Sequence, residues 1–265
     1  MKFILITLYR LTKKIVFYLG YKLEIKKKNS FTFLNLYKSY QEALKASKNE
    51  TTYITKNYQS SFRLLDLNDV EVADKFNILP LFFAFTHEKN EDNNLFLEIG
   101  GGHHPIFLYI LKSIGKKYKF QILEEQNFKV QIPQEYEDYL KYTYKLEDMK
   151  FKDSKVVIFS GSIQYIENYM KILEKIFSNK VKNVFITETM FTNKSEDTFT
   201  LQNNMLNVKF PNIFISFKKF NKLFDENNYE LVFQTKRKVG KYSHNILNKG
   251  EFFVKDLVYK LKEQT

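Results

Sequence analysis

Three glycines and two histidines follow an apolar stretch in the segment LFLEIGGGHHP, residues 95–105. The whole chain has eight glycines and four histidines, so this short segment holds a large share of both. Consecutive glycines at Gly100, Gly101 and Gly102 let the backbone turn tightly and come close to a ligand. The segment is therefore compatible with a nucleotide site, with a metal site that uses the histidines, or with a simple turn.

An acidic residue ends the next apolar stretch, KFQILE, at residues 119–124. Glu124, with Glu125 behind it, is placed to accept hydrogen bonds from ribose hydroxyl groups, because it follows Gly100 at close to the spacing of about 20 residues expected of nucleotide-binding units. A dinucleotide fingerprint would need a third glycine where Pro105 stands, and a P-loop would need a Gly-Lys-Ser/Thr ending that this chain lacks. The nucleotide interpretation therefore needs a different motif.

Strand-like and helix-like patterns alternate from residue 95 onward. Strands are predicted at 95–99, 119–124, 142–147, 155–162, 183–189, 229–239 and 251–261, and helices at 105–115, 167–179 and 217–228. Such alternation predicts an α/β fold with a mainly parallel, seven-stranded sheet covered by helices. The last two strands have no helix between them and are expected to form an antiparallel edge pair. Ligands of such sheets bind beyond the carboxyl ends of the strands.

Residues 1–90 are expected to form a helical N-terminal extension on a domain that spans residues 91–265. Helical patterns cover 40–48 and 72–87, with Pro80 as a kink or break in the second. The chain has no cysteine, which excludes disulfide bonds, thiolate zinc sites and a cysteine nucleophile.

The positive charge of the chain is concentrated at its N-terminus. The net charge is +12, of which residues 1–28 contribute 8 − 1 = +7, so the other 237 residues share only 12 − 7 = +5. A nucleic-acid enzyme would more often spread basic charge over its binding face. Nucleic acid is therefore not the expected partner.

The basic segment 1–28 has an amphipathic pattern. Its apolar residues recur near helical spacing, at Ile4, Leu8, Leu11, Ile15 and Leu19. Interior lysine and arginine residues argue against a membrane span, and no small-residue site follows that would suit signal-peptide cleavage. Two interpretations remain, a helix lying on an anionic membrane surface or a helix packed on its own domain. We expect a cytoplasmic protein, peripheral to the inner face of the membrane under the first interpretation.

The segment LEIGGG resembles the first motif of Rossmann-like S-adenosylmethionine-dependent methyltransferases. Further segments occur in the order found in a methyltransferase family often associated with bacterial surface-polysaccharide biosynthesis: SGSIQYIENY (160–169), VFITETMF (184–191), DTFTLQNNM (197–205) and FPNIFISFKKFNKLFDENNYEL (210–231). The segment YKSYQEALK resembles the N-terminal pattern of that family, with Tyr40 where tryptophan is usual. The resemblance covers about residues 35–240. The chain departs from the pattern at His104, where the last glycine is expected.

The resemblance implies a Rossmann-like class I methyltransferase fold, S-adenosylmethionine as methyl donor and S-adenosylhomocysteine as product. The leading expectation is O-methylation of a small molecule or glycan precursor, such as a sugar or a nucleotide- or phosphoryl-linked intermediate of capsule or lipopolysaccharide biosynthesis. The expected cofactor-binding residues are Glu98, Gly100, Gly101, Gly102, Glu124, Ser160, Gly161, Ser162 and Gln164.

Four residues are candidates for the chemistry. His103 and His104 are the favoured general bases, because the ordinary pKa of histidine lies near neutral pH. Tyr165 is placed to stack on adenine or to touch the acceptor, and Glu188 to bind a hydroxyl group or act as base. The alternatives are histidines that cap or pack, a core tyrosine and a surface acid. No metal site is expected, since no carboxylate partners the histidine pair at ligand spacing.

The polar stretch 192–209, which contains Gln202, has the composition of a mobile lid over the acceptor or of an ordinary surface loop. Two other functions stay open. The net charge is compatible with an RNA methyltransferase, and the departure at His104 with a degenerate, non-catalytic binding module.

Overall fold

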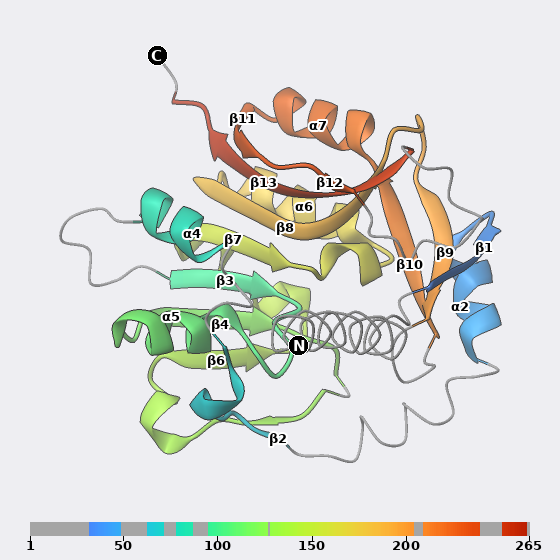
Figure 1. Cartoon of the computed structure of the whole chain (residues 1–265). Coiled ribbons are helices and arrows are strands. Elements are labelled where there is room, and N and C mark those ends of the chain that lie inside the picture. The colour runs from blue at the N-terminus through green and yellow to red at the C-terminus, as the bar shows by residue number, and fades with distance from the viewer. Residues whose placement is uncertain are drawn as a thin grey trace, which may run out of the picture.

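The computed structural model is organised around one sheet of eleven strands (Figure 1). It describes residues 32–48, 63–71, 78–86, 95–126, 128–203, 209–238 and 251–263. The amphipathic pattern predicted for residues 1–28 lies outside these ranges, as do residues 72–77 and 87 of the helix predicted at 72–87.

Seven strands form the expected core of the sheet. In spatial order they are β6 (Leu140–Thr143), β4 (Lys119–Leu123), β3 (Leu95–Ile99), β7 (Ser154–Ser160), β8 (Asn183–Thr192), β13 (Phe252–Leu261) and β11 (Tyr229–Gln234). The first five run parallel to their neighbours, and β13 runs antiparallel between β8 and β11. The predicted α/β class, the mainly parallel Rossmann-like sheet and the antiparallel pair formed by its last strands are confirmed.

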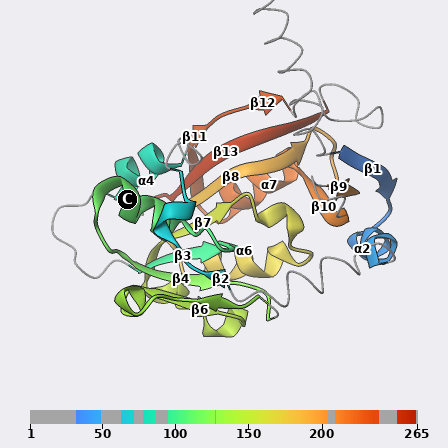
Figure 2. The same cartoon turned by 60° about the horizontal axis from the view of Figure 1, so that its bottom comes forward.

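The predicted total of seven strands is wrong, because four more strands join this sheet. They are β10 (Lys209–Ser216), β9 (Thr198–Asn203), β1 (Thr32–Tyr37) and β12 (Arg237–Lys238). Strand β9 pairs antiparallel with both β10 and β1, so part of the expected helical extension is a strand of the main sheet. Figure 2 shows β1, β9 and β10 together at one end of the molecule, with helix α2 (Tyr40–Lys48) beside them. A separate two-stranded sheet pairs β2 (Arg63–Leu64) with β5 (Val130–Gln131).

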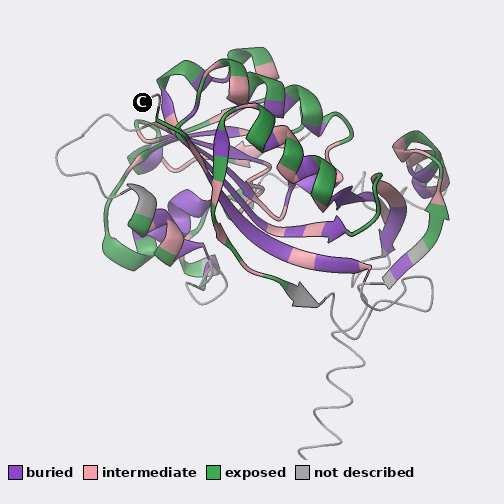
Figure 3. Cartoon of the chain, turned by 90° about the horizontal axis from the view of Figure 1, so that it is seen from above, coloured by how far each residue is buried: buried purple, intermediate pink, exposed green. Residues whose placement is uncertain are grey.

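Helices cover both faces of the sheet. The faces of α6 (Tyr169–Ser178) and α7 (Phe217–Glu226) pack on one side, with Leu97 and Ile99 of β3. On the other side α4 (Leu79–Thr86) and α5 (Ile106–Ile114) pack on Phe96. Alternate side chains of β3 therefore pack into the hydrophobic cores on opposite faces of the sheet, as expected of a pleated strand. Figure 3 shows the strands largely buried and the outer helix surfaces exposed.

Pro80 lies at the start of the described helix of this region, α4, which begins at Leu79 after a turn at Ile78. It is the second residue of α4, in the first turn, where its missing N–H would have no partner within the helix. Short 3-10 turns connect the remaining elements: η1 (Leu67–Asp69), η3 (Gln134–Tyr136), η4 (Leu146–Asp148), η5 (Phe151–Asp153) and η6 (Ile163–Tyr165). None of the described helices has both the length and the apolar character needed to cross a membrane.

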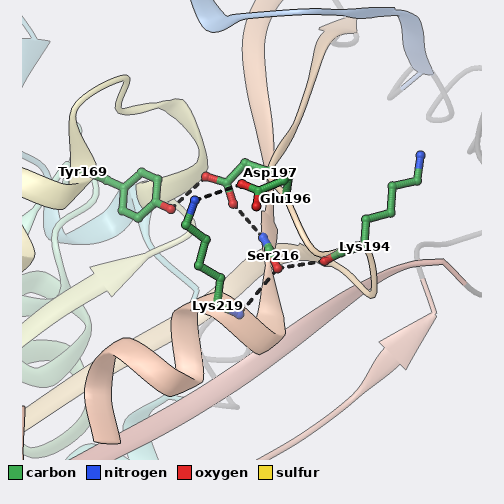
Figure 4. Close-up of polar contacts among 6 residues, drawn as sticks. All are labelled: Tyr169, Lys194, Glu196, Asp197, Ser216 and Lys219. Carbon is green, nitrogen blue, oxygen red and sulfur yellow. Dashed lines mark hydrogen bonds and ion pairs between the residues drawn. The ribbon is translucent and has the colours of Figure 1, made fainter. Parts of the chain in front are cut away.

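The stretch 192–209, interpreted from its composition as a lid or a surface loop, is mostly strand where the structure describes it. The end of β8, the strand β9 and the start of β10 occupy this stretch, and residues 204–208 lie outside the described ranges. The turn between β8 and β9 is fastened at Asp197, whose carboxylate accepts hydrogen bonds from the Tyr169 hydroxyl (2.9 Å) and the Ser216 N–H (2.8 Å) (Figure 4). The Ser216 hydroxyl in turn donates to the carbonyl of Lys194 (2.7 Å). Ser216 also caps α7, so the turn and the helix start form one hydrogen-bonded unit.

Candidate functional site

The glycine turn after β3 combines positive φ angles at Gly100 and Gly102 with close packing at Gly100 and Gly101. Gly100 (φ +73°) lies so close to the loop after β7 that a Cβ atom at this position would stand 2.6 Å from the Cβ of Ser162. A Cβ at Gly101 would stand 3.0 Å from the Glu98 carboxyl carbon. Gly102 (φ +60°) has nothing within 4 Å of the same position, so its backbone faces open space. A ligand can approach the main chain there.

Glu98 organises this turn from inside the protein. The residue is buried, and its Oε2 accepts a hydrogen bond from the Ile106 N–H (2.8 Å) at the start of α5. A carboxylate at a helix N-terminus satisfies a free N–H group and interacts favourably with the helix dipole. Glu98 therefore joins the end of β3 to the beginning of α5.

Glu124 and Tyr142 hold the turn from the neighbouring strands. Oε1 of Glu124, just after β4, accepts from the Gly102 N–H (2.5 Å), and the Tyr142 hydroxyl on β6 donates to the Gly102 carbonyl (2.8 Å). Burial raises the pKa of Glu124, and the hydrogen bonds from the N–H groups of Gly102 and Glu125 partly oppose this. Tyr142 has no motif around it that would mark it in the sequence.

The loop after β7 lies directly against the glycine turn. The Ser162 hydroxyl donates a hydrogen bond to the carbonyl of Ile99, which joins the ends of β3 and β7. Gly161 has a positive φ of +69° and donates its N–H to the Thr187 carbonyl of β8 (2.9 Å). Ser160, Gly161 and Ser162 are thus placed at the carboxyl ends of three adjacent parallel strands.

Gln164 and Tyr165 extend this loop towards β9. The Gln164 amide Nε2 donates to the carbonyls of Gly161 (2.9 Å) and Glu188 (3.3 Å). The Tyr165 hydroxyl donates to Gln202 Oε1 (2.9 Å), which also accepts from the amide of Asn212 on β10 (3.1 Å). Burial raises the pKa of Tyr165, with a smaller contribution in the same direction from the Glu188 charge.

Tyr165 is also fixed from the N-terminal part of the chain. The Tyr40 hydroxyl of α2 donates to the Tyr165 carbonyl (2.7 Å), and the Gln41 amide donates to the carboxylate of Glu167 (2.7 Å). Residues 125 positions apart in the sequence therefore meet at η6. This contact gives Tyr40, marked by the motif resemblance, a structural role beside the candidate site.

Glu188 turns its side chain towards the loop after β7. It has a positive φ of +52°, and its Oε2 lies 3.5 Å from where a Cβ atom of Gly161 would stand. Glu188 is partly exposed, unlike Thr187 and Thr189 beside it. Its carboxylate therefore belongs to the same group as Gly161, Gln164 and Tyr165.

The two histidines follow the glycine turn on another side. The His103 ring packs against Phe128, in the segment after β4, with ring centroids 4.3 Å apart, and His104 is exposed. The contacts of Glu188 and Tyr165 described above run instead to the loop after β7 and to β9. Within the described parts of the chain, no three His, Cys, Asp or Glu side chains are grouped as metal ligands would be.

No protein-family model and no curated protein matches the chain. Solved structures with a similar arrangement include a methyltransferase from Methanosarcina mazei (11% identity, TM-score 0.43, covering 68% of this chain and 98% of that one). Another is the 1,6-didemethyltoxoflavin-N1-methyltransferase of Burkholderia thailandensis, solved with S-adenosylhomocysteine (9% identity, TM-score 0.47, covering 84% of this chain and 89% of that one). A third is the CcbJ methyltransferase of Streptomyces caelestis (9% identity, TM-score 0.44, covering 79% of this chain and 96% of that one). At these identities and TM-scores the similarities carry no argument about the activity of this chain.

Proposed function

We propose that the chain is an S-adenosylmethionine-dependent methyltransferase. The observation that carries this proposal is the glycine turn at 100–102, which leaves open space over Gly102 and faces the Glu124 carboxylate across the carboxyl ends of β3 and β4. Backbone N–H groups beside a carboxylate at this edge of an α/β sheet suit a ligand with a ribose and a polar tail.

The residues present fit this cofactor. Glu124 uses Oε1 for the glycine turn. Among the described residues its Oε2 accepts only a long hydrogen bond, from the Glu125 N–H (3.4 Å), so this oxygen is proposed to bind ribose hydroxyl groups. The main chain of Gly100–Gly102 and the loop of Ser160–Ser162 would border the rest of the cofactor, with Gln164 behind the loop. Bound S-adenosylmethionine supplies an electrophilic methyl group on a sulfonium centre.

In this proposal the protein aligns an acceptor hydroxyl group with that methyl group and removes the hydroxyl proton. Glu188 is favoured as the base, because its carboxylate is partly exposed beside Gly161 and Tyr165. His103 and His104 were favoured by residue type, and each stays a candidate that substitution by alanine tests. Tyr165 is proposed to border the acceptor.

The acceptor is proposed to be a hydroxyl-rich small molecule, such as a sugar or a nucleotide- or phosphoryl-linked precursor of a surface polysaccharide. The motif resemblance at 160–169 and 184–191 supports this choice. The amide and phenol groups of Gln164, Gln202 and Tyr165 add support, since they are neutral groups that exchange hydrogen bonds with hydroxyls.

A calorimetric titration with S-adenosylhomocysteine tests the cofactor assignment. We expect saturable heat and an upward shift of the melting temperature. Absence of both at millimolar ligand would contradict the proposal, and nucleic acid that co-purifies with the active protein would favour an RNA acceptor.

Peripheral contact with the inner face of the membrane is proposed for residues 1–28. Their local charge of 8 − 1 = +7 and their apolar periodicity support reversible binding to an anionic lipid surface. In this proposal the enzyme works in the cytoplasm, close to membrane-bound assembly of envelope glycans.

A further inference from the structure

Glu188 adopts a backbone conformation that strands rarely contain. Its φ of +52° lies in the left-handed region, where a non-glycine residue pays a steric penalty. The residue lies within a ten-residue strand, β8, which pairs with β7 as far as Thr187 and with β13 on its other side. Such strain persists only where the surroundings enforce it, and it gathers at functional sites.

A β-bulge between β8 and β13 enforces this conformation. Thr189 pairs with Lys255 and Ile186 pairs with Leu257, so Thr187 and Glu188 together face the single residue Asp256. The extra residue of a bulge loses its regular ladder partner and bends the strand. The N–H of Glu188 therefore needs another acceptor.

The Asp256 side chain supplies that acceptor. Asp256 is 1% exposed, and its Oδ1 accepts from the Glu188 N–H (2.8 Å). Its Oδ2 accepts from the Thr235 hydroxyl (2.8 Å), and Thr235 and Asp256 exchange two further hydrogen bonds that involve their main chains. The carboxylate is thereby fixed in orientation. The carbonyl of Glu188 is also bound, because it accepts a hydrogen bond from the Gln164 amide (3.3 Å).

We propose that Asp256 is a positioning residue, which holds the bulge so that the Glu188 carboxylate faces Gly161 and the acceptor side of the site. In an extended conformation the side chain at 188 would point to one of the two sheet faces, and helices and core residues cover both. The role of Glu188 as base rests on the proposed function, whereas its orientation by Asp256 does not.

The absence of cysteine from the chain allows a clean test. Glu188→Cys introduces one thiol, and its rate of reaction with a soluble thiol reagent reports how far this side chain reaches solvent. The substitution is combined with Asp256→Asn, which keeps an acceptor oxygen, or with Asp256→Leu, which removes it. Both backgrounds lack the Asp256 charge and have similar volume, so a difference between them isolates the hydrogen bond.

We expect labelling of the Glu188→Cys thiol to be fast with Asp256→Asn and about tenfold slower with Asp256→Leu, because the relaxed side chain becomes buried. Tyr259→Phe is the matched control, since it removes a hydrogen bond of the same strand, from the Tyr259 hydroxyl to Asn221 (3.1 Å), away from the bulge. It should leave the labelling rate unchanged. A melting curve of each variant establishes that it is folded at the temperature at which the labelling rates are compared.

Equal labelling rates in the Asn and Leu backgrounds would overturn the positioning role. Failure of the wild-type protein to bind S-adenosylhomocysteine would overturn the proposed function instead, and the ligand-free labelling rates would still decide the role of Asp256. If Asp256→Leu does not fold, Thr235→Val in the Glu188→Cys protein provides the second variant, since it removes the hydroxyl that orients the Asp256 carboxylate. We expect slower labelling there too, and an unchanged rate would count against the proposal.

Discussion

Three glutamates lie at the carboxyl ends of the central strands, and their environments differ. Glu98 is buried and joins β3 to α5. Glu124 grips the turn with one oxygen and has the other oxygen available. Glu188 is partly exposed beside the loop after β7. In the proposed function, Glu124 meets the cofactor and Glu188 meets the acceptor.

Replacing Glu124 by alanine should weaken binding of S-adenosylhomocysteine by about 1–3 kcal/mol, because charge-assisted hydrogen bonds to the ribose are lost. Glu125→Ala is the control, since its side chain is exposed and adjacent. Isothermal titration calorimetry of both variants measures the difference. Equal losses in the two variants would remove Glu124 from the cofactor site.

Glu124 should also make stability depend on pH. Burial raises its pKa above the ordinary 4.5 in the folded protein, so the folded state binds this proton more tightly than the unfolded chain. The carboxyl group therefore costs no stability well below pH 4.5, and its cost develops as the pH rises through the raised pKa. Glu124→Gln removes that ionisation.

We expect the free energy of unfolding of Glu124→Gln, relative to wild type, to increase as the pH rises above about 4.5 and then to level off. Urea denaturation of both proteins at a series of pH values measures this difference. A difference that stays constant with pH would show that Glu124 does not titrate with a raised pKa.

At the scale of elements, the segments with strong local signals were predicted correctly. Strands β3, β7 and β8 are apolar runs, and α6 and α7 have clear helical periodicity, so burial and local preference agree. The turn after β3 was also predicted correctly, because three consecutive glycines are a strong local signal for a turn. The pairing of that turn with Ser162 follows from the sequence only once the parallel order of β3 and β7 is known.

Strands β9 and β10 were missed because their local signals point elsewhere. The sequence TFTLQN alternates polar and apolar residues inside a polar region, and Pro211 interrupts KFPNIFIS. Proline disfavours a strand prediction, although in this sheet it is accommodated opposite Leu201. The polar residues Gln202 and Asn212 are buried by pairing and by contact with Tyr165, which no local pattern encodes.

Gly100→Ala should destabilise the fold more than Gly115→Ala. Both glycines have positive φ, +73° and +69°, so alanine carries a similar backbone penalty of about 1 kcal/mol at each. Only at Gly100 would the new Cβ atom stand 2.6 Å from Ser162, whereas Gly115 has open space. Thermal unfolding should rank the variants in this order, and equal losses would contradict the close packing of the two loops.

Asp197→Ala should loosen the turn between β8 and β9. It removes the acceptor of the Tyr169 hydroxyl and the Ser216 N–H and should cost about 1–3 kcal/mol, since partly buried donors lose their partner. Glu196→Ala is the neighbouring control, because its pair with Lys219 is exposed and should contribute less than about 1 kcal/mol. Chemical denaturation distinguishes the two, and a cost at Asp197 no greater than at Glu196 would argue against a fastened turn.

At the scale of the whole molecule, the sheet joins distant parts of the chain. Strand β1 lies at one end of the sheet, where it pairs with β9. Strand β13, near the C-terminus, lies between β8 and β11. Tyr40 and Tyr165 add a contact across 125 residues. The candidate site is therefore bordered by residues before and after the α/β core, and its assembly depends on non-local pairing rather than on any single motif.

The uneven distribution of charge leads to a prediction about membrane binding. Residues 1–28 carry 8 − 1 = +7 of the +12 total, and each lysine or arginine near an anionic lipid surface contributes about 1 kcal/mol of attraction. We expect the full chain to co-sediment with vesicles that contain anionic lipid and to be released by high salt, because the charge component is screened. A variant that begins at Asn29 should stay in the supernatant while binding S-adenosylhomocysteine as the full chain does. Equal sedimentation of the two proteins would show that residues 1–28 are not the membrane contact, and loss of cofactor binding in the shorter protein would instead support packing of this segment on its own domain.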